Sequence, residues 1–537
     1  MRPRSQIITH LFLLSFLYHR PSVALSSHAN FTALCEDIRH SMIITDPSLA
    51  YNPDFVCGRP YAPDRNPSLP IRIPLTECMQ KCPGYDPSNR SVLSQWVGPL
   101  VGFLLPALAF VISIPRPFRM WRKDDRFAQH GFLGYLWLFV ALLLMALDTV
   151  IWIIVVFALA GPLIVGALHE AFIDHAVLDV VEELRTGVNA RTALTFTFVG
   201  SLEPKAGNLS TEISDDIVHS LHAREKLRAM LALLPSYGSR VGLPIVFYLG
   251  ASAYTLFDAG SKLGDNDTAH AIAFGLWYGV IVIAATVNCS VLGVDNPASL
   301  EAIFFEYVSH IPWGPKPWNF YDSLFQPVWL WDRARVFQKW ADELGDNLDP
   351  RIKSSILSRS WKFVWCIVAA FLISVPCALA CYVSYSTPEA GFGCRSVIHL
   401  VYATSQIILI LGWFYFSDLI HQNIDHGLVY HVGKIAMYCL CGLTVVVGGM
   451  FTAIGGTVMQ LVGLFRNCIC KAALSYLANY DGALVQVAID TQAHRDSWRY
   501  WRAFGITGIC VIAGISIVGW CYQVRTRSRC KTLIEQL

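Results

Sequence analysis

Charged residues are scarce in this chain: they make up 15% of its 537 residues, and no sustained run of Lys or Arg occurs. Nucleic-acid binding needs a dense basic surface, so this scarcity and a formal net charge of +2 exclude a nucleic-acid partner. Hydrophobic residues supply 54% of the chain, with a mean hydropathy of +0.44, and several apolar runs approach or exceed 18 residues. This composition is typical of a polytopic helical membrane protein whose main partner is the lipid bilayer.

The sequence also lacks the short motifs of the common enzyme classes. It has no GxSxG elbow, no P-loop, no GxGxxG turn, no HExxH helix and no DDxxD box. These absences predict no metal centre and no cofactor. No duplicated halves are visible either, so the inverted repeats of many transporters are missing.

The N-terminus has the features of a secretory signal peptide spanning residues 1–24. Arg2 and Arg4 precede an apolar stretch too short to cross a bilayer, and small residues lead up to Ala24. An uncleaved anchor is the alternative, and both interpretations place the following segment outside the cytosol.

That segment, residues 25–92, is polar and predicts a small disulfide-bonded, glycosylated extracytosolic domain. Four cysteines in a short exported stretch indicate two disulfides, with the connectivity left open. A metal site is less favoured, because no His follows at a useful spacing. The cysteines are Cys35, Cys57, Cys78 and Cys82, and the accessible glycosylation acceptors in the whole chain are Asn30, Asn89 and Asn266.

The rest of the chain predicts an all-α membrane protein, a polytopic transmembrane helix bundle of about nine spans in two groups. The first group, 93–292, has spans near 93–114, 131–147, 150–168, 241–257 and 270–292, with a cytosolic amphipathic segment at 169–240. A cytosolic aromatic-rich loop, 293–361, leads to the second group, 362–522. Its spans lie near 363–385, 396–416, 433–464 and 503–522, before a basic cytosolic tail at 523–537.

The apolar run 132–168 decides the orientation of everything that follows it. If it crosses once, the basic segments after it face outside; if it crosses twice, they all fall in the cytosol, as the positive-inside rule favours. We therefore expect a hairpin that turns at Asp148 and Thr149. Asp148 is then the solvated tip of a hairpin, and the other interpretation makes it an intramembrane acid with a functional role.

Two cytosolic stretches have a predicted local structure. The ends of 169–240 are amphipathic and are expected to lie along the membrane or to pack on one another. The aromatic-rich loop is expected to form an interfacial collar, followed by a surface helix over 332–344. The collar tryptophans are Trp313, Trp318, Trp329, Trp331 and Trp340.

The candidates for chemistry are weak. Asp418, His421 and Asp425 share one helical face, which suits a divalent metal or a proton relay, but a short polar loop explains them as well. A second group, running from His169 to Glu182, resembles a solvated helix face. Small residues recur every four positions within 433–464, which favours close static packing over a sliding surface.

Several stretches resemble a large family of polytopic integral membrane proteins of filamentous fungi. They are LSQWVGPLVGFLLPALAFVISIPRP, DTVIWIIVVFALAGP, LGDNDTAHAIAFGLWYG with NPASLE, PVWLWDRARVFQKW and NYDGALVQVAIDTQAHRDSWRYW. The resemblance covers most of the chain from Cys57 onward. It implies an architecture and a fungal source, and it brings no catalytic residues.

The expected function is non-enzymatic: transport, sensing or scaffolding, with an unknown small-molecule cargo, at the plasma membrane or an endomembrane. The N-terminus is expected outside and the C-terminus in the cytosol. The alternative is a membrane-embedded enzyme acting on a lipid or a secondary-metabolite intermediate, with Asp418, His421 and Asp425 as its centre.

Overall fold

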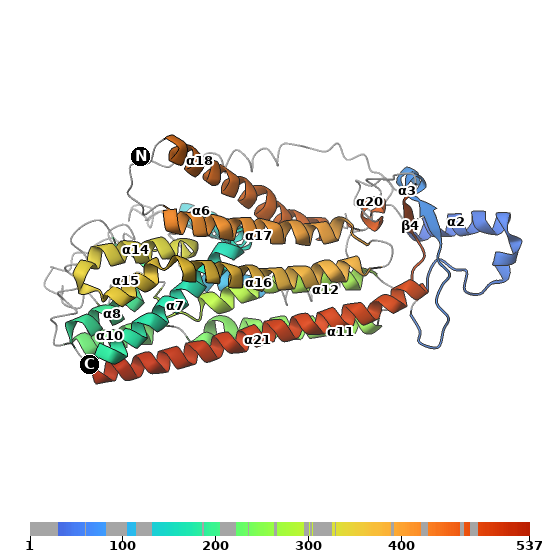
Figure 1. Cartoon of the computed structure of the whole chain (residues 1–537). Helices are drawn as coiled ribbons and strands as arrows, with labels where there is room; N and C mark the ends of the chain where they lie inside the picture. The colour runs from blue at the N-terminus through green and yellow to red at the C-terminus, as the bar shows by residue number, and fades with distance from the viewer. Residues whose placement is uncertain are drawn as a thin grey trace.

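The computed structural model describes most of the helical core of the chain (Figure 1). The described residues are 31–59, 61–81, 105–113, 131–184, 187–204, 222–234, 236–261, 266–294, 300, 303, 325–327, 329–387, 391–419, 428–461, 465, 467–472 and 482–537. The predicted signal peptide, Asn30, Cys82, Asn89, His421 and Asp425 lie outside them, as do most of the first span, Trp313 and Trp318.

Long apolar helices form a bundle in which they run beside one another (Figure 1). Among the described residues, six helices are long and apolar enough to cross a membrane, or seven if one bent pair counts as a span. The bundle helices are α5 (Leu105–Ser113), α6 (Gly131–Ala158), α7 (Ala160–Leu184), α11 (Leu243–Ser261), α12 (Asn266–Asn288), α16 (Arg359–Tyr385), α17 (Cys394–Leu419), α18 (Leu428–Leu443), η8 (Thr444–Gly455), α19 (Gly456–Leu461) and α21 (Gln492–Gln536).

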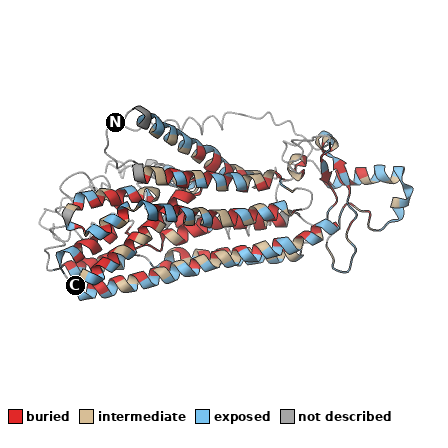
Figure 2. Ribbon diagram, viewed as in Figure 1, coloured by how far each residue is buried: buried red, intermediate tan, exposed pale blue. Residues whose placement is uncertain are grey.

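The centre of the bundle is α12, whose apolar span is 83% buried, against 17–44% for the other unbroken candidates. Those helices turn apolar side chains outward, as Figure 2 shows by their exposed outer faces. A helix that is apolar all round and exposed on one side suits a lipid environment. The predicted all-α membrane fold is therefore supported, while the count of about nine spans stays a prediction.

One end of the bundle carries the N-terminal segment: α2 (Phe31–Thr45), η1 (Pro47–Tyr51), β1 (Arg72–Pro74) and α3 (Leu75–Lys81). This segment shares its core with a later part of the chain, because β1 pairs antiparallel with β4 (Leu484–Gln486). Val485 and Cys468 are both fully buried in that shared core, beside the short helix α20 (Cys468–Lys471). The N-terminal segment is thus folded onto the loop that precedes α21.

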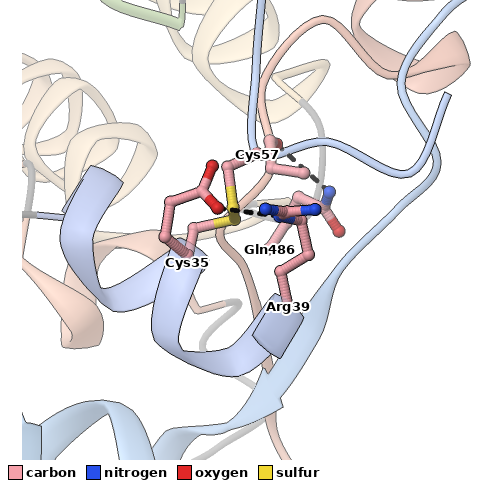
Figure 3. Close-up of a disulfide and its surroundings, with 6 residues drawn as sticks. Cys35, Arg39, Cys57 and Gln486 are labelled. Carbon is pink, nitrogen blue, oxygen red and sulfur yellow. Dashed lines mark hydrogen bonds and ion pairs between the residues drawn. A yellow bond between two sulfur atoms is a disulfide. The ribbon is translucent and has the colours of Figure 1, made fainter. Parts of the chain in front are cut away.

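Three disulfides lie at this same end, and they correct the expected pairing. Cys35 bonds to Cys57 within the N-terminal segment, where Gln486 of β4 lies beside the bridge (Figure 3). Cys78 instead bonds to Cys468, which is 390 residues away, so the four N-terminal cysteines do not pair only among themselves. The third bridge joins Cys394 to Cys470 and ties α17 to the same loop.

The opposite end holds a second compact core, built from α8 (Val188–Val199), α10 (Ala223–Leu233), α14 (Arg333–Leu344), α15 (Pro350–Leu357) and the ends of α7 and α21. A two-stranded ribbon, β2 (Leu202–Pro204) with β3 (Phe325–Pro327), closes it. The helices of 169–240 therefore pack on one another, one of the two expected arrangements. Within the collar, Trp340 departs from the expected interfacial position: it is 1% exposed, and its indole N–H donates to the Leu202 carbonyl at 2.8 Å.

The expected hairpin at Asp148 is wrong. Helix α6 runs without interruption from Gly131 to Ala158, so Asp148 and Thr149 lie inside a helix rather than in a turn. The chain bends after this helix, and α6 and α7 meet at 75°.

Candidate functional site at the helix break

Proline causes the break between α6 and α7. Pro162 has no N–H, and its ring clashes with the carbonyl four residues earlier, which is that of Ala158. The normal helical bond from the Gly161 N–H to the Phe157 carbonyl is also replaced at the bend. Three backbone groups deep in the bundle therefore need new partners, because an unsatisfied buried group costs several kcal/mol in lipid.

Two side chains of α17 supply these partners. The Gln406 amide oxygen accepts the Gly161 N–H at 2.9 Å, and its nitrogen donates to the Ala158 carbonyl at 3.1 Å. The Tyr402 hydroxyl donates to the Phe157 carbonyl at 2.7 Å. Gln406 and Tyr402 are both fully buried, and their side chains satisfy the three backbone groups at the break.

A second irregular helix lies against the break. The segment η8 is a π-helix of 12 residues, and such stretches occur frequently at functional sites. A Cβ on Gly449 would lie 2.8 Å from the Cα of Ala158, so only glycine lets the two backbones approach this closely. The neighbouring Gly448 packs in the same way against Ser405. The small residues of 433–464 therefore serve close packing, as expected.

Aromatic rings enclose the break from the side of α12. Trp277 is fully buried, with its ring centroid 6.0 Å from that of Phe157 and 5.3 Å from that of Tyr402. The ring of His399, also fully buried, lies 5.6 Å from Trp277, and neither of its nitrogens has a hydrogen-bond partner among the described residues. Buried aromatic rings therefore surround the few polar groups that close the break.

A second polar group of residues lies further along α7, at the end of the bundle away from the disulfides. Glu170 forms an ion pair with Arg333 of α14, and their side chains are 0% and 1% exposed. Asp174 accepts the Leu292 N–H at 2.9 Å and is also fully buried. A Cβ on Gly293 would lie 2.3 Å from the Glu170 carboxylate, so glycine makes room for this pair.

Two polar side chains also close the end of α17 in this region. The Lys362 ammonium and the Gln338 amide both donate to the Ser417 carbonyl, each at 3.0 Å. Donors at a helix C-terminus satisfy its last carbonyls and oppose the negative end of the dipole. The fully buried His169 lies edge-on to Trp413 nearby, with their ring centroids 6.1 Å apart.

The structure places the candidate residues from the sequence in different environments. His169, Glu170 and Asp174 are buried, while His175 and Asp179 keep the exposed face expected for the whole group. Asp148 is half-buried within α6. Asp418 follows Ser417 at the end of α17, but its side chain and its two partners lie outside the described residues. Within the described part of the chain, no three His, Cys, Asp or Glu side chains gather as a metal site.

Sequence reasoning missed the residues that define the break. The signal was present, since Gly161-Pro162 interrupts an apolar run and Gln406 is a lone amide in another. Comparisons with profiles of known families, with curated proteins and with solved structures gave no match. The resemblance to fungal membrane proteins stays a prediction, and the function must be argued from the geometry.

Proposed function

We propose that this chain is a multi-pass membrane protein of the secretory pathway or cell surface that moves a small solute across the bilayer. One observation carries the proposal: a helix is broken inside the bundle at Pro162, and a π-helix packs against the broken segment at Gly449. Transporters build their substrate sites from discontinuous helices of this kind. The α6–α7 break is then the binding element, and Gln406 and Tyr402 are the side chains with which a cargo would exchange hydrogen bonds.

The chemistry around the break favours a small, uncharged polar cargo with an apolar part. Hydroxyl or amide groups on the cargo would exchange with the bonds that Gln406 and Tyr402 now make to the backbone. Trp277 and Phe157 offer ring surfaces for its apolar part. Ligand sites commonly combine aromatic walls with a few such polar groups.

The proposed orientation places the disulfide end outside and the opposite end in the cytosol. Disulfides persist in oxidising compartments, and all three bridges lie at one end. The basic tail of α21 lies at the other end, as the positive-inside rule favours. In this orientation the bent α6–α7 pair is re-entrant, which returns the chain to the cytosolic side.

The test reconstitutes the full chain in vesicles and follows a panel of amino acids, sugars, polyols and nucleosides. We expect saturable movement of one class, reduced at least ten-fold per folded protein by Gln406→Glu, which removes the amide donor to Ala158. Thr404→Val is the matched control, because Thr404 is exposed on the same helix and bonds only within it. Equal movement by wild type and Gln406→Glu would overturn the assignment of the site.

A membrane-embedded enzyme is the second candidate, and the buried polar group on α7 favours it. Glu170 and Asp174 place two interacting carboxyl groups in a buried region, and His169, a potential base, is buried on the same helix; acid–base chemistry uses such groups. The same vesicle experiment separates the two functions. An enzyme releases a chemically altered product, whereas a transporter delivers its cargo unchanged.

A further inference from the structure

The second half of α21 has an outward face that changes from apolar to polar along the helix. Ile517, Val518, Trp520 and Val524 are each at least 50% exposed. From Arg525 to Thr532 the exposed positions carry cationic or hydroxyl side chains, and Glu535 and Gln536 are exposed beyond them at the end of the helix. Such a change within one helix is expected where it leaves the hydrocarbon and enters the headgroup layer, with Trp at the boundary.

An open hollow of about 540 Å³ lies at this boundary. Trp520 and Val524 form its apolar wall, and Arg525 and Arg529 lie at its polar end. Helix α21 lies at the edge of the bundle (Figures 1 and 2), and all the residues that line the hollow belong to this helix.

The two arginines differ in their partners. Arg529 is paired with Asp179 at 2.7 Å and also with Glu182, both on α7. Arg525 is exposed and makes no ion pair with any described carboxylate. As far as the described residues extend, the hollow therefore has one cation without an ion-pair partner, Arg525, at its polar end and apolar walls beside it.

We propose that this hollow binds an anionic phospholipid, with the headgroup on Arg525 and the acyl chains along Trp520 and Val524. An anionic lipid supplies both the charge and the apolar tail that the two ends of the hollow match. A soluble anion matches only Arg525 and leaves the apolar wall exposed. The membrane orientation given under the proposed function is needed only to assign the lipid to the cytosolic leaflet.

The test uses the purified full-length protein, delipidated in a neutral detergent. Phosphatidylserine or phosphatidylcholine is added back, and lipid retained on the protein is counted by native mass spectrometry. We expect phosphatidylserine to be retained, phosphatidylcholine much less, and Arg525→Gln to weaken phosphatidylserine binding about five-fold, the value of one cation near a membrane surface. Arg525→Lys keeps the charge and should keep the lipid.

The controls make each outcome decisive. Arg499→Gln removes an exposed arginine from the other end of α21, where it stacks on Tyr500, and should leave retention unchanged. An equal loss in Arg499→Gln, or no loss in Arg525→Gln, overturns the proposal. Glycerophosphoserine has the headgroup without acyl chains; if it displaces phosphatidylserine at equal concentration, the hollow is a soluble-anion site and the lipid proposal is wrong. Because retention is counted without any solute, a failed transport assay leaves this result intact.

Discussion

The side chain of Gln406 replaces a missing piece of helix, because its amide oxygen accepts the N–H of Gly161 while its nitrogen serves the Ala158 carbonyl. A single amide thus supplies both the acceptor and the donor that a proline-broken helix lacks. The bend of 75° between α6 and α7 is stable in the bundle because α17 holds this residue at the same level.

Replacing Gln406 by Leu should lower the stability of the protein. The variant keeps a buried apolar side chain but leaves two backbone groups without partners, which costs about 1–3 kcal/mol for each group. Thermal unfolding in detergent, followed by circular dichroism, measures the difference. Thr404→Val should unfold at the same temperature as wild type. An unchanged unfolding midpoint in Gln406→Leu would show that the backbone groups at the break have other hydrogen-bond partners.

The buried ion pair between Glu170 and Arg333 gives a second prediction. Glu170→Gln leaves a buried guanidinium without its counter-charge, so the expected loss is about 3–5 kcal/mol. The double variant with Arg333→Met should recover part of this loss, since it removes both charges. Chemical denaturation of Glu170→Gln, Arg333→Met and the double variant measures the coupling free energy between the two side chains.

A solvent-exposed ion pair serves as the matched control for Glu170 and Arg333. Arg351 pairs with Glu183 across the same end of the bundle, but their side chains are 51% and 66% exposed. Arg351→Gln should therefore leave the free energy of unfolding nearly unchanged, because exposed ion pairs contribute little to stability. If the stability losses of Glu170→Gln and Arg333→Met simply add in the double variant, the two side chains do not stabilise the protein as an ion pair.

Much of the bundle could be predicted because an apolar run of span length leaves few alternatives in lipid. The predicted spans near 270–292, 363–385 and 396–416 coincide closely with α12, α16 and α17. The break could not be placed by the same reasoning, since hydropathy does not register the missing N–H of Pro162. The positive-inside rule predicts a turn at Asp148 and Thr149, yet α6 accommodates the half-buried acid within a continuous helix.

The buried polar residues were also beyond sequence reasoning. A helical period places residues on a face, but the partner that covers the face decides their burial. Arg333 lies 163 positions after Glu170, and Cys468 lies 390 after Cys78, so neither pairing has a local signal.

Packing at the break predicts the effect of a single methyl group. Gly449→Ala would press a Cβ against the backbone of Ala158, which cannot move aside as a flexible side chain does. Overpacking of this kind costs about 1–3 kcal/mol. Gly442→Ala in α18 is the control, because no atom lies within 4 Å of the added Cβ. It should unfold at the wild-type temperature or slightly above it. Equal midpoints for both variants would mean that η8 and α6 lie further apart than described.

Glycan mapping tests the orientation of the whole bundle. Expression in a eukaryotic host should attach glycans at Asn30, Asn89 and Asn266 and leave Asn208 bare, although all four are sequons. The reason is structural: Glu182, near the end of α7, is bonded to Arg529 of the basic tail, so the chain approaching Asn208 lies at the end opposite the disulfides. Gel mobility before and after deglycosylation, repeated with Asn→Gln at each site, gives the result. A glycan at Asn208 would mean that the bent α6–α7 pair crosses the membrane once, and it would reverse the proposed side of every later segment up to the tail.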